Sequence, residues 1–254
     1  MSRRSAILLV GGTDSSGGAG LAADIRTAAA HGVDARLAVT AVTAQTDGRV
    51  GTVHVMRPDL VAAQIAMALE DGRVSAIKIG MLGDAAIVRA VAEALAGFGG
   101  PIVLDPVIAA TSGGLLLSED GMAELIGRLL PIAALVTPNL QELAILAARL
   151  DVATGADIDT GSRALLDTGA GAVLVKGGHG EGRDSVDILT QAGRPAIRLH
   201  SPRLAATLRG TGCTLATAIA CRLAAGDTLE DACADAKAFV TRLLKGLPDQ
   251  PKGG

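Results

Sequence analysis

The sequence contains almost no aromatic side chains. It has neither tryptophan nor tyrosine, and Phe98 and Phe239 are its only phenylalanines. Proteins that bind single-stranded nucleic acid stack bases on aromatic rings, and that platform is missing here. Any flat ring bound by this chain must therefore lie between aliphatic side chains, with hydrogen bonds to orient it. An aromatic cage is excluded.

An excess of basic charge is missing as well. Lysine and arginine total 23 against 26 aspartates and glutamates, which gives a net charge of −3. The basic residues are scattered along the chain, whereas a nucleic-acid-binding face needs a basic patch or stripe. Together with the lack of aromatics, this argues against a nucleic acid as partner.

Long apolar runs and paired cysteines are also scarce. No run reaches the roughly 20 residues of a membrane helix, and Ala6–Val10 is too short for the core of a signal peptide. The cysteines Cys213, Cys221 and Cys233 are odd in number and form no C-x-x-C pair, so they indicate neither zinc nor a disulfide framework. We therefore expect no membrane partner and a location in the reducing cytoplasm.

What the sequence does contain is a regular alternation of short apolar runs with longer segments of helical spacing, in a chain that is 49% hydrophobic. The runs predict strands at Ala6–Val10, Arg36–Thr40, Val50–Val55, Ala76–Ile79, Pro101–Leu104, Ala134–Val136, Ala172–Val175, Val186–Leu189 and Ala196–Leu199, the last two as a hairpin. The longer segments predict helices at Leu21–Ala30, Pro58–Leu69, Ala85–Ala96, Gly121–Leu130, Leu140–Leu150, Ser162–Thr168, Thr214–Ala224 and Leu229–Leu244. This alternation predicts an α/β fold with a mostly parallel sheet covered on both faces.

The alternation runs without a linker, which predicts one domain over residues 1–246. The remaining residues, 247–254, are rich in proline, glycine and charge and are predicted to form a flexible tail. Ligands of such sheets bind beyond the carboxyl ends of the strands. Candidate functional residues are therefore those that directly follow the apolar runs.

The segment Arg209-Gly210-Thr211-Gly212-Cys213-Thr214 leads straight into an apolar helix. The first amides of a helix lack partners within it and carry partial positive charge, so they can bind an anion. Glycine lets the backbone approach a phosphate closely. An ordinary turn and helix cap without a ligand fits this segment equally well.

Cys213 falls in the first turn of that predicted helix. A thiolate is stabilised at a helix N-terminus and could there accept the proton of an attacking hydroxyl, so we expect a lowered pKa if Cys213 is a base. The alternative is a small buried thiol that packs against the start of the helix. Cys221 and Cys233 lie inside predicted helices, where the packing role is favoured.

The glycine-rich stretch that follows the first strand, from Gly11 to Gly20, is neither a dinucleotide fingerprint nor a P-loop. It has no G-x-G-x-x-G in the required register and no G-K-[ST]. It could still let a substrate lie against bare backbone. Asp24, which follows it, is either a substrate contact or a solvated helix carboxylate.

Polar side chains also follow three later strands. Asp105 ends one of them, and Asn139 and Glu142 follow the next. Carboxylates near a phosphate site are plausible ligands for Mg²⁺, although Asn139 and Glu142 also fit a plain helix start. Lys176 ends a further strand and could neutralise phosphate charge, while the nearby His179 fits a loop histidine better.

Several of these stretches, taken in order, resemble hydroxymethylpyrimidine/phosphomethylpyrimidine kinases of the ribokinase-like family. The matching stretches are Gly12-Thr13-Asp14-Ser15-Ser16-Gly17-Gly18-Ala19-Gly20, Val39-Thr40-Ala41-Val42-Thr43-Ala44-Gln45, Lys78-Ile79-Gly80-Met81-Leu82, Leu104-Asp105-Pro106-Val107, Thr137-Pro138-Asn139 with Glu142, Lys176-Gly177-Gly178-His179, Gly210-Thr211-Gly212-Cys213-Thr214 and Ala236-Lys237-Ala238-Phe239-Val240. They extend from about residue 6 to residue 245.

The resemblance implies a three-layer α/β/α fold, ATP and Mg²⁺ as cofactors, and phosphorylation of hydroxymethylpyrimidine and then of its monophosphate in thiamine biosynthesis. It also implies a homodimer. Carried over by position, it implies a role for each matching residue: Cys213 as catalytic base; Gly210, Thr211 and Gly212 as anion hole; Lys176, Asn139, Glu142 and Thr211 at the nucleotide phosphates; Asp105 and Glu142 at the metal; and Gly12, Asp24, Gln45, Met81 and Val107 around the pyrimidine.

The chain departs from the pattern of this family at three places. Arg209 stands where the family usually has histidine, Ala22 where it has glutamine, and Thr46-Asp47 where it has Asn-Thr. These departures bear on the identity of the acceptor and on the second phosphorylation. Two alternatives remain open, a pyridoxal or pyridoxine kinase of the same fold and a catalytically weak pyrimidine-binding regulatory protein. A sugar kinase is disfavoured because Cys213 replaces the aspartate expected there.

Overall fold

One sheet of nine strands runs through the computed structural model, which describes residues 5–109, 114–178, 182–206 and 208–246. Its strands are β1 (Ala6–Asp14), β2 (Asp34–Gln45), β3 (Val50–Val55), β4 (Val74–Ile79), β5 (Ile102–Leu104), β6 (Leu135–Val136), β7 (Ala172–Val175), β8 (Asp184–Gln191) and β9 (Ile197–Pro202). Their order is β3-β2-β1-β4-β5-β6-β7-β8-β9. From β2 to β7 all neighbours pair in parallel, whereas β3, β8 and β9 are antiparallel. The predicted parallel sheet and the predicted β8–β9 hairpin are both confirmed.

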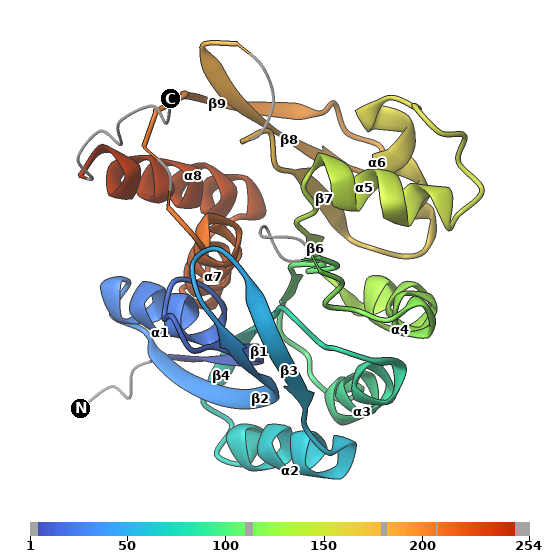
Figure 1. Ribbon diagram of the computed structural model, residues 1–254. Helices are drawn as coiled ribbons and strands as arrows, with labels where there is room; N and C mark the ends of the chain where they lie inside the picture. Colours follow the sequence, from blue (N-terminus) through green and yellow to red (C-terminus); the bar gives the residue numbers. More distant parts are fainter. Residues whose placement is uncertain (1–4, 110–113, 179–181, 207, 247–254) are drawn as a thin grey trace.

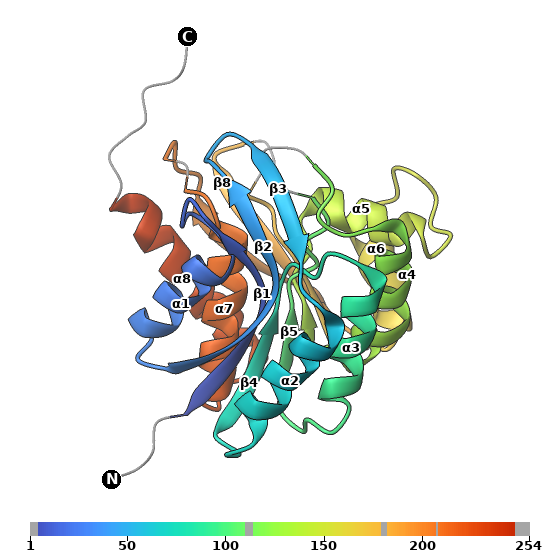
Figure 2. The same cartoon turned by 60° about the horizontal axis from the view of Figure 1, so that its bottom comes forward.

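Helices cover both faces of this sheet, which gives the predicted three layers (Figures 1 and 2). One face carries α1 (Gly20–Ala30), α7 (Thr211–Ala224) and α8 (Leu229–Lys245). The other carries α2 (Pro58–Leu69), α3 (Ala85–Leu95), α4 (Glu119–Glu124), α5 (Leu140–Ala148) and α6 (Ile158–Asp167). Figure 2 shows the two groups on opposite sides of the strands.

The central strand β1 shows why the apolar runs are unbroken. Its side chains alternate between the two faces, so that Leu8 and Val10 pack in the core under α2 and α3, while Ile7 and Leu9 pack against α1 and α7. Both sets are fully buried. A strand that is covered on both faces has no polar side, and the sequence therefore reads as a continuous apolar segment.

Several boundaries differ from the sequence prediction. The first strand continues to Asp14, because the backbone of Gly12, Thr13 and Asp14 pairs with β2 beyond a bulge between Gly11 and Gly12. Such pairing uses main-chain groups and needs no apolar side chains. The segment predicted as one helix over Gly121–Leu130 is α4 followed by a π-helical turn and a short 3-10 turn. Helix α7 begins at Thr211 rather than at Thr214.

We retain one domain over residues 1–246 as a proposal, because the sheet collects strands from residue 6 to residue 202. The predicted tail at 247–254 and His179 lie outside the described residues. Within the described part of the chain, no helix has both the length and the apolar character that a bilayer crossing requires.

Candidate active site

The N-terminus of α7 is held against the loop between β1 and α1. Gly210, the cap residue, has a left-handed backbone (φ 74°), and a Cβ added there would lie 2.5 Å from the carbonyl oxygen of Gly18. Both constraints require glycine. The helix takes its first hydrogen bond from the Thr214 amide to the Gly210 carbonyl (2.8 Å), so the preceding amides are not used by the helix and can bind an anion.

A lysine stands opposite these amides. A Cβ added to Gly212 would lie 3.2 Å from Lys176 Nζ and 3.9 Å from Asp105 Oδ2. Lys176 follows β7 and donates a hydrogen bond to Asp105 Oδ1 (2.7 Å), and its Nζ lies 3.7 Å from Glu142 Oε2. The structure therefore brings together residues that follow β5, β6 and β7 at the start of α7, as expected for a parallel sheet.

Asn139 and Glu142 form the capping box of α5. The Glu142 amide donates to Asn139 Oδ1 (2.9 Å), and the Asn139 amide donates to Glu142 Oε2 (2.8 Å). The plain helix start that the sequence left open is thus present. The Asn139 side-chain oxygen is engaged in this cap, whereas Glu142 reaches Lys176 as well. Burial raises the pKa of Glu142, and Lys176 partly offsets that effect.

Asp105 is the buried acid of this cluster, with 2% exposure. Burial alone would raise the pKa of Asp105, but Lys176 and Lys78 hold it below its usual value. Thr137, whose hydroxyl donates to Asp105 Oδ1 (3.1 Å), was not singled out from the sequence. Asp105 is therefore ionised beside the anion-binding amides.

Cys213 lies in the first turn of α7, as predicted, and is partly exposed. The predicted lowering of its pKa is wrong for this structure, because burial raises the pKa of the Cys213 thiol to about 11. The Lys78 ammonium and a hydrogen bond from the Gly20 amide act to lower that pKa, whereas Asp24 and Asp105 raise it further. Burial, together with the two carboxylates, thus outweighs Lys78 and the Gly20 amide in setting the pKa of Cys213.

Asp24 is a buried ion-pair residue in this structure, so the solvated helix carboxylate predicted as one alternative is wrong. Its side chain is fully buried; Oδ2 accepts a hydrogen bond from Lys78 Nζ (2.8 Å) and Oδ1 accepts one from the Thr217 hydroxyl (2.8 Å). Thr217 is one helical turn after Cys213 on α7, which places this buried ion pair beneath the thiol. Lys78 could have been found from the sequence, because it is a charged residue inside an apolar strand. A charge buried in this way requires a partner of opposite charge.

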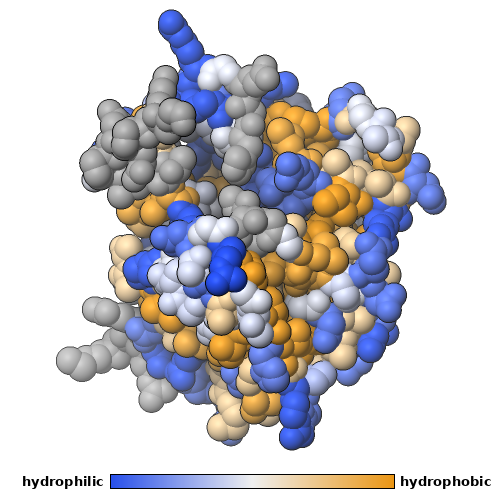
Figure 3. Space-filling model, viewed as in Figure 1, coloured by the Kyte–Doolittle hydropathy of each residue, from blue (hydrophilic) through white to orange (hydrophobic). Residues whose placement is uncertain are grey.

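Of the other residues predicted around the pyrimidine, Gly12 and Gln45 lie near the ends of β1 and β2, and Met81 and Val107 follow β4 and β5. A Cβ added to Gly12 would lie 2.8 Å from Met81 Sδ, so that glycine lets Met81 lie against the backbone of β1. Gln45 ends β2 and is partly exposed. Val107 is also partly exposed, and its amide donates to the Asp105 carbonyl (2.8 Å). Figure 3 shows apolar surface beside the β2–β3 hairpin, which suits a ring that must lie against aliphatic groups.

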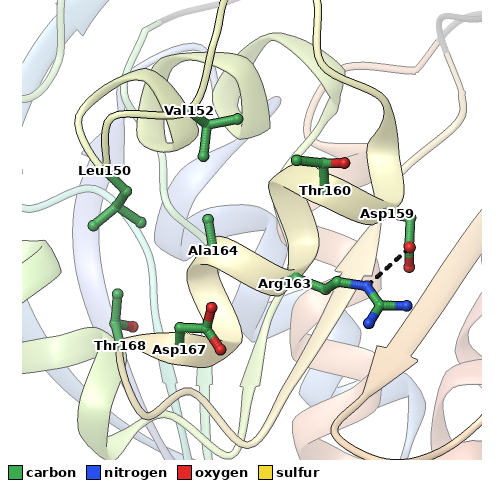
Figure 4. Close-up of a pocket in the computed structure, with 8 residues that line it drawn as sticks. All are labelled: Leu150, Val152, Asp159, Thr160, Arg163, Ala164, Asp167 and Thr168. Atoms are coloured by element: carbon green, nitrogen blue, oxygen red, sulfur yellow. Dashed lines mark hydrogen bonds and ion pairs between the residues drawn. The ribbon is translucent and has the colours of Figure 1, made fainter.

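A surface cavity of about 500 Å³ lies apart from this cluster, between α6 and the loop that joins α5 to α6 (Figure 4). Its polar side chains include Asp159 and Arg163, which pair with each other (2.9 Å) and are more than half exposed. None of the strand-end residues described above lines it. We therefore place the chemistry at the start of α7 and not in this cavity.

Comparisons with known proteins show the family to which the chain belongs. The family model described as phosphomethylpyrimidine kinase matches residues 14–253. The hydroxymethylpyrimidine/phosphomethylpyrimidine kinase of Rhizobium meliloti (strain 1021) is 42% identical over 234 residues, which cover 92% of this chain and 88% of the relative.

Two solved structures are similar to the chain over nearly its whole length. The phosphomethylpyrimidine kinase of Clostridium difficile 630 has a TM-score of 0.80 at 32% identity and covers 94% of this chain and 99% of its own. The pyridoxal kinase of Staphylococcus aureus, in complex with AMP-PCP and pyridoxal, has a TM-score of 0.83 at 28% identity and covers 96% and 89%. With the family model matched over residues 14–253, the chain belongs to the phosphomethylpyrimidine kinase family.

Proposed function

We propose that the chain transfers the γ-phosphate of ATP, with Mg²⁺, to the hydroxyl of hydroxymethylpyrimidine and then to the resulting monophosphate. The observation that carries this is the start of α7, where Gly212 lies close to Lys176 Nζ, the first amides are not used by the helix, and the thiol of Cys213 follows directly. Phosphoryl transfer depends chiefly on positioning and charge neutralisation, and this arrangement supplies both. Cys213 is the proposed acceptor of the hydroxyl proton.

The donor set beside Lys176 fits Mg²⁺. Among the described residues, the hydrogen bonds to the Asp105 and Glu142 carboxylates use Oδ1 and Oε2, which leaves Oδ2 and Oε1 as oxygen ligands. Mg²⁺ commonly takes one or two carboxylates, with phosphates and water completing its shell. Among the described residues, no group of three or more His, Cys, Asp or Glu side chains is arranged to hold a metal ion. When bound, the ion would neutralise phosphate charge.

Pyridoxal is the second candidate acceptor, because the Staphylococcus aureus pyridoxal kinase matches 96% of the chain. The test is turnover of ATP by the purified protein with hydroxymethylpyrimidine, its monophosphate and pyridoxal in parallel, with products identified by mass. We expect turnover with both pyrimidines and weaker turnover with pyridoxal. Turnover with pyridoxal alone would reassign the acceptor, and no turnover would favour a pyrimidine-binding regulator.

A cytoplasmic location, where ATP is available, and a homodimer remain parts of this proposal.

Replacing Glu142 by glutamine tests the metal assignment. Glutamine preserves the capping box with Asn139 and removes only the charge. We expect the Mg²⁺ concentration for half-maximal turnover to rise about tenfold, equivalent to about 1.4 kcal/mol. Glu119→Gln, at an exposed carboxylate that pairs with Arg149, is the matched control and should leave the requirement unchanged. An unchanged requirement in Glu142→Gln would make this carboxylate purely structural.

A further inference from the structure

Arg209 joins three segments that are far apart in the sequence. Its Nη1 donates hydrogen bonds to Ser16 Oγ (2.8 Å) and Asp47 Oδ1 (2.9 Å). Its Nη2 lies 3.3 Å from Asp14 Oδ2 and donates to Gln45 Oε1 at 3.4 Å. Arg209 directly precedes Gly210, the cap residue of α7. Its guanidinium thus connects the start of α7 to the loop after β1 and to the end of β2.

The two carboxylates differ in environment. The Asp14 side chain is 1% exposed, and its oxygens also accept hydrogen bonds from the amides of Ser16 (2.8 Å) and Ala19 (2.8 Å). The Asp47 side chain is 84% exposed. Burial acts to raise the pKa of Asp14, but these hydrogen bonds and Arg209 hold it below its usual value. Asp14 therefore binds the guanidinium of Arg209 on its buried side, while Asp47 binds it on the solvent side.

This anchoring sets the orientation of Gln45. Its backbone is fixed by Ser15, which accepts a hydrogen bond from the Gln45 amide (2.8 Å) and donates one to the Gln45 carbonyl (2.9 Å). A guanidinium has donors and no acceptor, so Gln45 must turn Oε1 toward Arg209. The NH₂ of the Gln45 side chain is then left to donate to another acceptor, such as a ring nitrogen of a bound substrate.

We propose that Arg209 is a positioning residue that fixes the carboxamide of Gln45 for the acceptor, and that Asp47 is its partner in this task. The inference rests on the proposed function, since it takes Gln45 to contact the acceptor. Arg209 and Asp47 pair directly in the structure, with Nη1 2.9 Å from Oδ1, so that Asp47 helps to hold the guanidinium that meets Gln45.

The test measures KM for hydroxymethylpyrimidine and for ATP, together with calorimetric binding of the pyrimidine, in single and double variants. Removal of a hydrogen-bonding partner costs about 1–3 kcal/mol, so Gln45→Ala should raise the KM for the acceptor roughly ten- to a hundredfold. Arg209→Ala should raise it about tenfold, because an oriented amide is lost, with the KM for ATP within about twofold of wild type. In the Gln45→Ala background, Arg209→Ala should add nothing.

Three further variants separate positioning from a general structural role. Arg209→His should share the defect of Arg209→Ala. Asp47→Ala removes the solvent-side partner of Arg209 and should raise the acceptor KM in the same direction, but by less than Arg209→Ala does. Arg194→Ala, which breaks an exposed ion pair with Glu230 elsewhere, should change neither KM.

Additive effects of Gln45→Ala and Arg209→Ala, or an equal rise in the KM for ATP, would overturn the positioning role. So would an unchanged acceptor KM in Arg209→Ala when the wild-type protein is active. Failure of the proposed function has a different signature, because the wild-type protein itself would then neither bind nor phosphorylate the pyrimidine.

Discussion

Replacing Cys213 by alanine is expected to lower turnover by about a hundredfold or more, the usual contribution of a general base. The sulfur lies in the first turn of α7, where it accepts a hydrogen bond from the Gly20 amide and lies in the field of Lys78. The anion-binding amides belong to the backbone and survive the substitution. The KM for ATP should therefore stay near its wild-type value, which separates loss of the base from loss of the phosphate site.

The direction in which the rate changes with pH tests the same role of Cys213. Only the thiolate can take the proton, and burial raises the pKa of Cys213 to about 11. Below that pH the thiolate fraction rises about tenfold per unit, and kcat/KM for the acceptor should rise with it. Cys213→Asp should recover part of the activity lost in Cys213→Ala, with a flat profile across neutral pH because a carboxylate is already ionised there.

Alkylation identifies the thiol directly. Cys213 is partly exposed, whereas Cys221 and Cys233 are buried and burial raises the pKa of each to about 12. Iodoacetamide should label Cys213 first, and ATP with acceptor should protect it. Cys233→Ala, a change on the buried face of α8, serves as control and should keep both activity and labelling. Full activity in a folded Cys213→Ala protein would contradict the role as base and leave the kinase assignment standing.

Much of the fold could be predicted from the sequence because local signals agree with it. Strand β7 and helix α2 have the predicted bounds, since both are unbroken periodic segments with clear ends. The cluster of Asp105, Glu142 and Lys176 could also be predicted, because residues that follow parallel strands meet at one edge of the sheet. The end of β1 could not, since Gly12 and Thr13 join the strand through backbone pairing alone.

The rest of the site depends on contacts between distant residues. Asp24 on its own reads as a solvated helix carboxylate, and only the fold brings it to Lys78, which is 54 residues away. Arg209 likewise reaches partners that are 162 residues away (Asp47) to 195 residues away (Asp14, 209 − 14). The raised pKa of the Cys213 thiol has the same origin, because Asp24 and Asp105 approach it only in the folded chain.

Lys78→Met is expected to destabilise the fold by about 3–5 kcal/mol, because it leaves the Asp24 carboxylate buried without its counter-ion. Both side chains are 1% exposed and lie 2.8 Å apart. Urea unfolding of the variant and the wild type would measure the change in the free energy of unfolding. Arg36→Met, which breaks an ion pair of 2.6 Å whose side chains are more than a third exposed, is the control and should cost no more than about 1 kcal/mol.

The pH dependence of this loss identifies its cause. Burial already raises the pKa of Asp24 above its ordinary value, and removal of Lys78 takes away the strongest opposing charge. A carboxyl with a raised folded-state pKa favours the fold at low pH, and that contribution is lost as pH rises through the folded pKa. The stability of Lys78→Met should therefore fall from about pH 4 toward neutrality. Asp24→Asn in the same chain removes the unpaired charge, keeps an acceptor for the Thr217 hydroxyl, and should restore most of the stability with little pH dependence. A deficit in Lys78→Met that is independent of pH, or that Asp24→Asn does not relieve, would contradict the buried ion pair as the source of the effect.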